Sequence, residues 1–132
     1  MILVDTSVWI SYFNGIECWQ TDSLDRALGE ETVLTGDIIL AEILQGFNKD
    51  SDYRKAKLAL DSLDCIHLGG KGLAIKTATN FRFLRSKGIT IRKTVDMLIG
   101  TWCMESEVEL LHNDRDFDKI AGYLPLKIFS GY

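Results

Sequence analysis

Apolar residues along the chain form two kinds of segment, short continuous runs and longer stretches with helical spacing. Residues 1–4, 31–34, 65–68, 108–112 and 126–129 are mostly apolar runs with the length of buried strands. Between them, apolar positions recur every three or four residues over 8–13, 22–28, 38–47, 51–63, 73–87, 95–104 and within 113–122. We predict a strand for each run and a helix for each stretch, with Ser7 and Thr94 as helix caps. Alternating strands and helices predict a largely parallel sheet with a site at the carboxyl ends of its strands.

The length and composition indicate one ordinary folded domain over residues 1–132. A chain of 132 residues with 46% hydrophobic and 26% charged residues can bury a single core. Its longest apolar stretches are far shorter than the roughly 20 residues that span a bilayer. The first residues lack the basic region and cleavage site of a signal peptide, so we expect a cytoplasmic protein with no membrane partner.

The cysteines and the N-terminal aromatic residues are expected to be structural. Cys18, Cys65 and Cys103 form neither an even disulfide set nor a metal-ligand pair, and we interpret them as core thiols. The aromatic group of Trp9, Tyr12, Phe13 and Trp19 could form a partner groove or a dimer face, but packing in the core is the preferred interpretation.

The charges are unevenly distributed along the chain. The net charge is −4, yet no acidic residue lies between Cys65 and Val95. That segment carries Lys71, Lys76, Arg82, Arg85, Lys87, Arg92 and Lys93. Such segregation can create a local phosphate-binding surface on an acidic protein, with Arg82, Arg85, Arg92 and Lys93 as candidates for holding an RNA backbone. A solvated basic helix face is the simpler alternative.

Several carboxylates stand where an apolar residue is expected. Asp5 ends the first predicted strand, Glu42 interrupts an apolar helix, and Asp96 lies in the first turn of another apolar helix. Asp114 and Asp116 follow the fourth predicted strand. Burying a carboxylate costs free energy unless it is paired, hydrogen-bonded or bound to a metal. Strand ends and helix N-termini of a parallel sheet converge on one crevice, so these acids could meet there.

An acidic cluster of this kind needs cations. Four carboxylates about 5 Å apart repel one another by roughly 3 kcal/mol per pair at an effective dielectric constant near 20. Oxygen ligands without histidine or cysteine favour Mg²⁺ or Mn²⁺ over zinc. Each acid also has a structural alternative: Asp5 and Asp114 could cap helices, Asp96 could interact with a helix dipole, and Glu42 could pair with a lysine or arginine.

Four motifs, in order along nearly the whole chain, resemble PIN domains of the VapC type. They are MILVDTSVW at residues 1–9, LAEILQG at 40–46, VDMLI at 95–99 and HNDRDF at 112–117. The resemblance implies a three-layer α/β/α fold with a mainly parallel five-stranded sheet. It also implies metal-dependent endonucleolytic cleavage of RNA, homodimerisation and inhibition by a VapB-like antitoxin, as in toxin–antitoxin pairs.

By position, the resemblance assigns site residues as well. Asp5, Glu42, Asp96 and Asp114 correspond to the family's acidic quartet, and Asp116 to a frequent additional acid. His112 stands where many relatives have threonine. The expected roles are that Asp5, Asp96 and Asp114 hold one Mg²⁺ or Mn²⁺, while Glu42 orients the attacking water or helps to bind a second ion.

Three other classes of protein fit the sequence less well. A haloacid-dehalogenase-like phosphatase needs an acid two positions after the first aspartate, where this chain has Ser7. A receiver domain needs a phospho-accepting aspartate after the third strand, and Leu68-Gly69-Gly70 offers none. A non-catalytic PIN-like module that binds RNA or protein is the serious alternative, although such modules usually lose the acids that this chain keeps.

Overall fold

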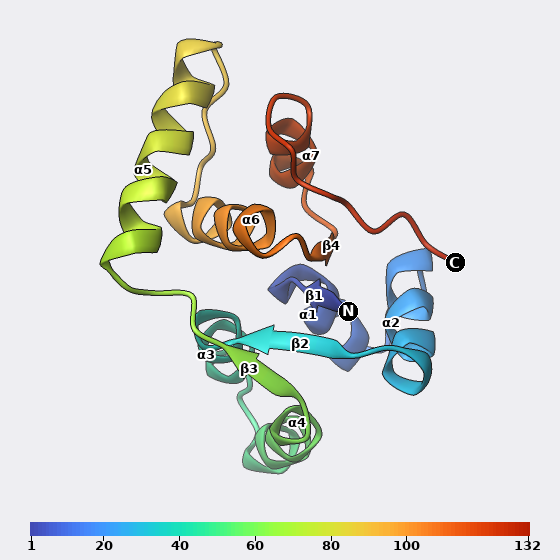
Figure 1. Cartoon of the computed structure of the whole chain (residues 1–132). Coiled ribbons are helices and arrows are strands. Elements are labelled where there is room, and N and C mark those ends of the chain that lie inside the picture. The colour runs from blue at the N-terminus through green and yellow to red at the C-terminus, as the bar shows by residue number, and fades with distance from the viewer.

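A computed structural model describes residues 1–132, and its strands and helices alternate along the chain (Figure 1). The strands are β1 (Ile2–Val4), β2 (Val33–Gly36), β3 (Asp64–Ile66) and β4 (Glu109–Leu111). The helices are α1 (Thr6–Phe13), α2 (Trp19–Glu30), α3 (Asp37–Gln45), α4 (Asp50–Asp61), α5 (Lys71–Ser86), α6 (Thr94–Ser106) and α7 (Arg115–Ala121). Every predicted helix is present, with ends shifted by a few residues, and the α/β class is confirmed.

The sheet is parallel throughout, with the strand order β3-β2-β1-β4. Leu3 of the central strand β1 is aligned with Leu34 of β2 on one side and with Leu110 of β4 on the other. From β1 the chain therefore proceeds outward to β2 and β3, and then returns to the opposite side of β1 to form β4. In parallel sheets a ligand-binding crevice lies at the carboxyl ends of the strands where the order reverses, which here is between β1 and β4.

The prediction of a fifth strand at 126–129 is wrong, because that segment makes only an isolated parallel bridge between Ile128 and Leu110. Two hydrogen bonds hold it to β4, from Leu110 N to Lys127 O and from Phe129 N to Leu110 O, each 2.9 Å. The chain then leaves the sheet edge, and the Tyr132 hydroxyl donates to Glu31 at the end of α2. Pairing thus stops after one residue because the C-terminus packs against α2, which lies beside it in Figure 1.

The helices fall into two contacting groups. The first group contains α1, α2, α3 and α4, in which α1 contacts α2 and α3, and α3 contacts α4. The second group contains α5, α6 and α7, in which α6 contacts both α5 and α7. Figure 1 shows α5, α6 and α7 together on one side of the strands and α3 and α4 on the other, so the three-layer arrangement is confirmed. The core is a cluster of 25 buried apolar residues that includes all of β1. Trp9 of α1 and Phe117 of α7 are among its largest fully buried side chains.

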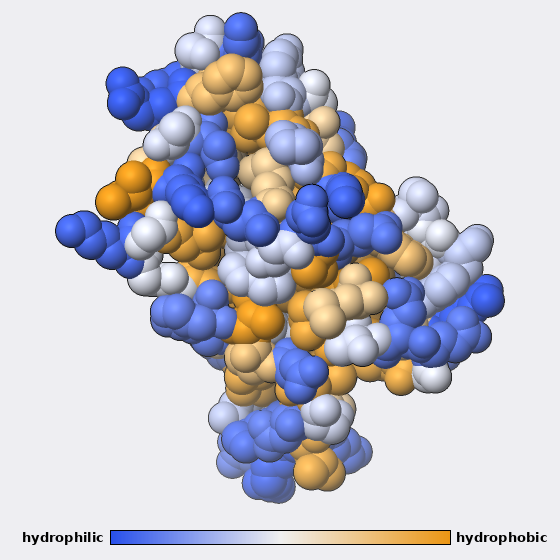
Figure 2. Space-filling model, in the orientation of Figure 1, coloured by the Kyte–Doolittle hydropathy of each residue, from blue (hydrophilic) through white to orange (hydrophobic).

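The structural interpretation of the cysteines and aromatic residues is confirmed only in part. Cys103 is buried, but Cys18 is half-buried and Cys65 is exposed, because it belongs to the edge strand β3. Trp9 lies in the core, whereas 49% of Trp19 is exposed. Figure 2 shows apolar residues scattered among hydrophilic ones on the visible face. None of the helices is both long and apolar enough to cross a membrane.

Candidate active site

Asp5 and Asp114 occupy the carboxyl ends of β1 and β4, where they cap the following helices. The Asp5 Oδ2 atom accepts hydrogen bonds from Ser7 N at 3.0 Å and from Ser7 Oγ at 2.6 Å. The Asp114 Oδ1 atom accepts from Asp116 N at 3.0 Å. Asp5, and not Ser7, is therefore the cap of α1. Each carboxylate uses one oxygen for capping, so the helix-cap and metal-ligand alternatives are compatible with each other.

A hydrogen-bond chain links the two strand ends. Asn113 N donates to Ser7 Oγ at 3.0 Å, and Ser7 Oγ donates in turn to Asp5. Asp5 N also donates to Leu111 O at 2.9 Å. The loop after β4 is thereby held against the start of α1, which fixes Asp5 and Asp114 on the two sides of the crevice.

Asp96 is a buried acid of the site whose pKa is strongly raised. It lies in the first turn of α6, is only 6% exposed, and its Oδ2 atom is buried without a hydrogen-bond partner. Burial, followed by the charges of Asp5 and Asp114, raises the pKa of Asp96 to about 7, although Lys93 acts in the opposite direction. The carboxylates of Asp5 and Asp114 thus lie close enough to Asp96 to repel its charge.

Glu42 reaches the same region from α3. It is half-buried, and its Oε1 atom accepts a hydrogen bond from Thr6 Oγ1 at 2.7 Å. Burial raises the pKa of Asp5, and the charge of Glu42 adds to this effect, while hydrogen bonds from Ser7 oppose it. Glu42 thus does not extend freely into solvent, and its charge acts on Asp5. The alternative pairing of Glu42 with a lysine or arginine is not observed.

Asp116 has different neighbours from the other acids. It is 1% exposed, and its Oδ2 atom accepts from Arg92 Nε at 3.2 Å, while Lys119 Nζ lies 3.4 Å from Oδ1. Arg92 Nη2 is also 3.7 Å from Asp114 Oδ1. Burial acts to raise the pKa of Asp116, but the hydrogen bonds from Arg92 and Lys119 lower it overall. Both oxygens of Asp116 face cations of the protein, so its role as a metal ligand stays a prediction.

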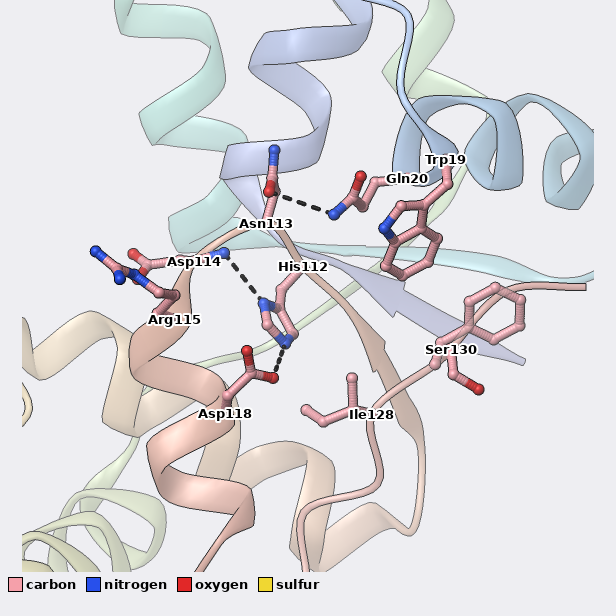
Figure 3. A pocket seen from close by; sticks show the side chains of 10 residues that line it. Trp19, Gln20, His112, Asn113, Asp114, Arg115, Asp118, Ile128 and Ser130 are labelled. Carbon is pink, nitrogen blue, oxygen red and sulfur yellow. Dashed lines mark hydrogen bonds and ion pairs between the residues drawn. The ribbon is translucent and has the colours of Figure 1, made fainter.

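His112 is a component that the sequence pattern did not assign. It is 7% exposed, and its Nδ1 atom accepts from Asp114 N at 3.1 Å, so the proton must be on Nε2, which lies 3.2 Å from Asp118 Oδ1. Figure 3 shows the ring between the Asp114 backbone and the Asp118 carboxylate. His112 therefore orients the loop that carries Asp114. The spacing of six residues between His112 and Asp118 gives no local signal of this contact.

The donor chemistry of the site fits a hard divalent cation. Asp5, Glu42, Asp96 and Asp114 offer only carboxylate oxygens, and Asp96 Oδ2 is a buried oxygen without a partner. No three acidic, histidine or cysteine side chains are placed so that, as they stand, they could together hold one metal ion. Like charges favour separated positions, and bringing these carboxylates into one coordination sphere requires a cation to offset their repulsion.

Comparison with known proteins identifies the family. The family model for the PIN domain matches residues 2–123, and the chain belongs to this family. The resemblance to VapC-type members is confirmed, since the protein is 29% identical to Ribonuclease VapC11 of Mycobacterium tuberculosis, with 98% of each chain covered. It has the same identity and coverage with a VapC ribonuclease of Mycobacterium bovis.

Solved structures show the same fold. VapBC2 from Rickettsia felis, bound to a DNA fragment from its promoter, contains a chain that matches with a TM-score of 0.75 and 20% identity, covering 100% of this chain and 99% of that one. VapBC-1 from nontypeable Haemophilus influenzae matches with a TM-score of 0.73 and 18% identity, with 98% and 97% coverage. The sarcin–ricin loop cleaving toxin VapC20 of Mycobacterium tuberculosis matches with a TM-score of 0.69 and 18% identity, with 96% and 99% coverage.

Proposed function

We propose that the protein is a VapC-type ribonuclease, the toxin of a toxin–antitoxin pair, that hydrolyses internal phosphodiester bonds of RNA with the help of Mg²⁺ or Mn²⁺. The observation that carries the proposal is the buried carboxylate of Asp96, which has one oxygen without a hydrogen bond and is repelled by Asp5 and Asp114. A buried anion in this setting is costly unless a cation accompanies it. The PIN-domain family and the ribonuclease names of the relatives support the same function.

The residues that would hold the ion are Asp5, Asp96 and Asp114. When bound, a divalent cation offsets the charge that grows on the phosphate oxygens and lowers the pKa of a nearby water. Ser7 orients Asp5 through its two hydrogen bonds and leaves the other carboxylate oxygen available. Glu42, which accepts a hydrogen bond from Thr6, would accept a proton from the attacking water or help to bind a second ion.

The basic residues beside the acids would bind the RNA backbone. Arg92 and Lys119 contact Asp116 and line a pocket that also includes Asp114 and Arg115. Cations at the rim of an acidic site compensate the charge of incoming phosphates, which otherwise would be repelled by the carboxylates. Arg82 and Arg85 of α5 lie outside this pocket, so their contact with RNA rests only on the charge of the segment.

The proposal includes partners and a place of action. We infer that one PIN domain over residues 1–132 acts in the cytoplasm, forms a homodimer and is inhibited by a VapB-like antitoxin. Support comes from relatives named VapC and from matching structures described as VapBC complexes. Sedimentation of the purified protein, alone and mixed with a VapB-like antitoxin, tests this part.

The test of the nuclease is cleavage of a mixed transfer and ribosomal RNA pool in Mg²⁺, Mn²⁺ or EDTA. We expect discrete fragments in either metal, none in EDTA, and none with Asp5→Asn or Asp96→Asn. The matched control is Asp64→Asn, since Asp64 is an exposed acid of β3 without an ion pair. Metal binding measured calorimetrically on the same proteins separates a failure to bind metal from a failure to cleave. A folded, metal-loaded wild-type protein that leaves every RNA intact would instead identify a PIN-like binding module.

A further inference from the structure

A pocket of about 370 Å³ adjoins the acidic site, and the metal chemistry does not use it. It is formed by three segments that are distant in sequence, the start of α2, the loop after β4 and the C-terminal segment. The side chains able to contact a ligand there include Trp19, Gln20, His112, Asn113 and Asp118. In Figure 3, Trp19 and Gln20 lie on one side of the pocket, Asp114 and Arg115 on the other, and His112 between them.

We infer that this pocket binds one unpaired base of the RNA substrate next to the bond that is cut, and that Trp19 stacks on that base. This inference rests on the proposed function. Trp19 is 49% exposed in a protein whose other N-terminal tryptophan is buried. The half-exposed Trp19 indole lines the pocket and can act as a stacking platform, since proteins hold unpaired RNA bases by stacking them on aromatic side chains.

The polar groups of the pocket can read the edge of a base. Gln20 Nε2 donates to Asn113 Oδ1 at 3.3 Å, which leaves the Gln20 carbonyl oxygen and the Asn113 amide hydrogens without a protein partner. Asp118, whose side chain is 64% exposed, keeps a second oxygen as an acceptor beyond its contact with His112. The pocket therefore offers two acceptors, the Asp118 carboxylate and the Gln20 amide oxygen, and the amide donors of Asn113, which together can pair with the donors and acceptors on the edge of a base.

The position of the pocket joins it to the reacting phosphate. Asn113, Asp114 and Arg115 line both this pocket and the neighbouring pocket that contains Arg92, Asp116 and Lys119. Asn113 is also connected to Asp5 through Ser7. A nucleotide whose phosphate lies against the acids and cations can therefore place its base in the pocket.

The composition of the pocket favours RNA over a protein partner. Only 3 of its 10 lining residues are hydrophobic, whereas a groove for an amphipathic helix needs a continuous apolar surface. The combination of one aromatic face with several free donors and acceptors is suited to a flat, polar-edged ligand.

The experiment compares cleavage specificity and nucleotide binding in the same set of proteins. RNA with one randomised position is cleaved in Mn²⁺ and the ends are sequenced, and fluorescein-labelled oligonucleotides that differ only in that base are titrated in EDTA. For Trp19→Ala we expect binding to weaken by roughly 5- to 150-fold, the range for loss of one base–aromatic stack. We also expect the wild-type preference at one position beside the cut to be lost, while cleavage itself persists.

Three further variants make the test specific. Trp19→Phe should keep most of the binding, since it keeps an aromatic face, and Gln20→Ala should change the base preference even if Trp19→Ala fails to fold. The control is Ile16→Ala, because Ile16 is 52% exposed, precedes α2 and does not line the pocket.

The outcomes separate this inference from the proposed function. If folded Trp19→Ala and Gln20→Ala both cleave RNA with an unchanged base preference, the base-binding inference is refuted. The proposed nuclease function is then unaffected. If the wild type cleaves no RNA yet binds oligonucleotides in a Trp19-dependent manner, the nuclease fails and the base pocket stands. Weakened antitoxin binding in both variants, with unchanged RNA binding, would assign the pocket to a protein partner and refute the inference.

Discussion

Replacing Asp96 with asparagine should remove activity and at the same time stabilise the metal-free protein at alkaline pH. Asp96 is buried in α6, repelled by Asp5 and Asp114, and has one oxygen without a partner. The asparagine side chain has nearly the same shape but no charge, so both the desolvation cost and the repulsion would be absent. The stability gain therefore measures the cost of the charge that a bound cation is expected to offset.

The magnitude follows from the pKa of Asp96, which is about 7 in the fold against an ordinary value of 3.8. Because the folded-state pKa is raised, the native protein binds more protons than the unfolded chain between these values, and its stability falls as pH rises through that window. Ionising Asp96 in the native protein lowers the unfolding free energy by roughly 4 kcal/mol well above pH 7, and about 2–3 kcal/mol of this loss develops between pH 5 and pH 8. The buried amide hydrogens of the variant carry a pH-independent cost of about 1–3 kcal/mol.

The assay is urea unfolding of metal-free wild type and Asp96→Asn in EDTA at pH 5 and pH 8. We expect the variant to gain about 2–3 kcal/mol of unfolding free energy relative to wild type between the two pH values. Asp64→Asn serves as the control, and its difference from wild type should change by less than about 0.5 kcal/mol. If the difference in unfolding free energy between Asp96→Asn and wild type instead changes as little with pH as that of the control, ionised Asp96 does not destabilise the fold. In that case our reasoning about the metal site is refuted.

The remaining predictions test the same site and the protein surface. Saturating Mn²⁺ should raise the melting temperature of wild type and leave Asp5→Asn and Asp96→Asn unchanged; an equal rise in all three would contradict a site at these acids. Ser7→Ala should lower stability by about 1–2 kcal/mol in thermal unfolding and raise the pKa of Asp5, because the hydroxyl that donates to Asp5 and accepts from Asn113 N is lost. A thiol reagent should modify Cys65 in the folded protein and Cys103 only on unfolding, since Cys65 is exposed and burial raises the pKa of Cys103 to about 12. Mass mapping after a brief reaction identifies the modified residue, and early labelling of Cys103 would show that α6 opens.

The order of the elements and the identity of the acids were predictable from the sequence because both are recorded locally. Helical spacing and short apolar runs depend on neighbouring residues, and a carboxylate inside an apolar segment is visible without knowing the fold. The rule that strand ends converge was enough to expect Asp5, Asp96 and Asp114 near one another. In the structure the charges of Asp5 and Asp114 both raise the pKa of Asp96, whereas their joint role as a metal site stays a prediction.

Tertiary structure alone determined which distant side chains meet. The pairing of Arg92 with Asp116, the contact of Gln20 with Asn113, and the reduction of the fifth strand to a bridge at Ile128 join segments separated along the chain. Sequence periodicity shows which face of an element is buried, but it carries no information on which polar group lies opposite. That depends on helix packing and loop paths, whose free energies are sums over many contacts between different parts of the molecule.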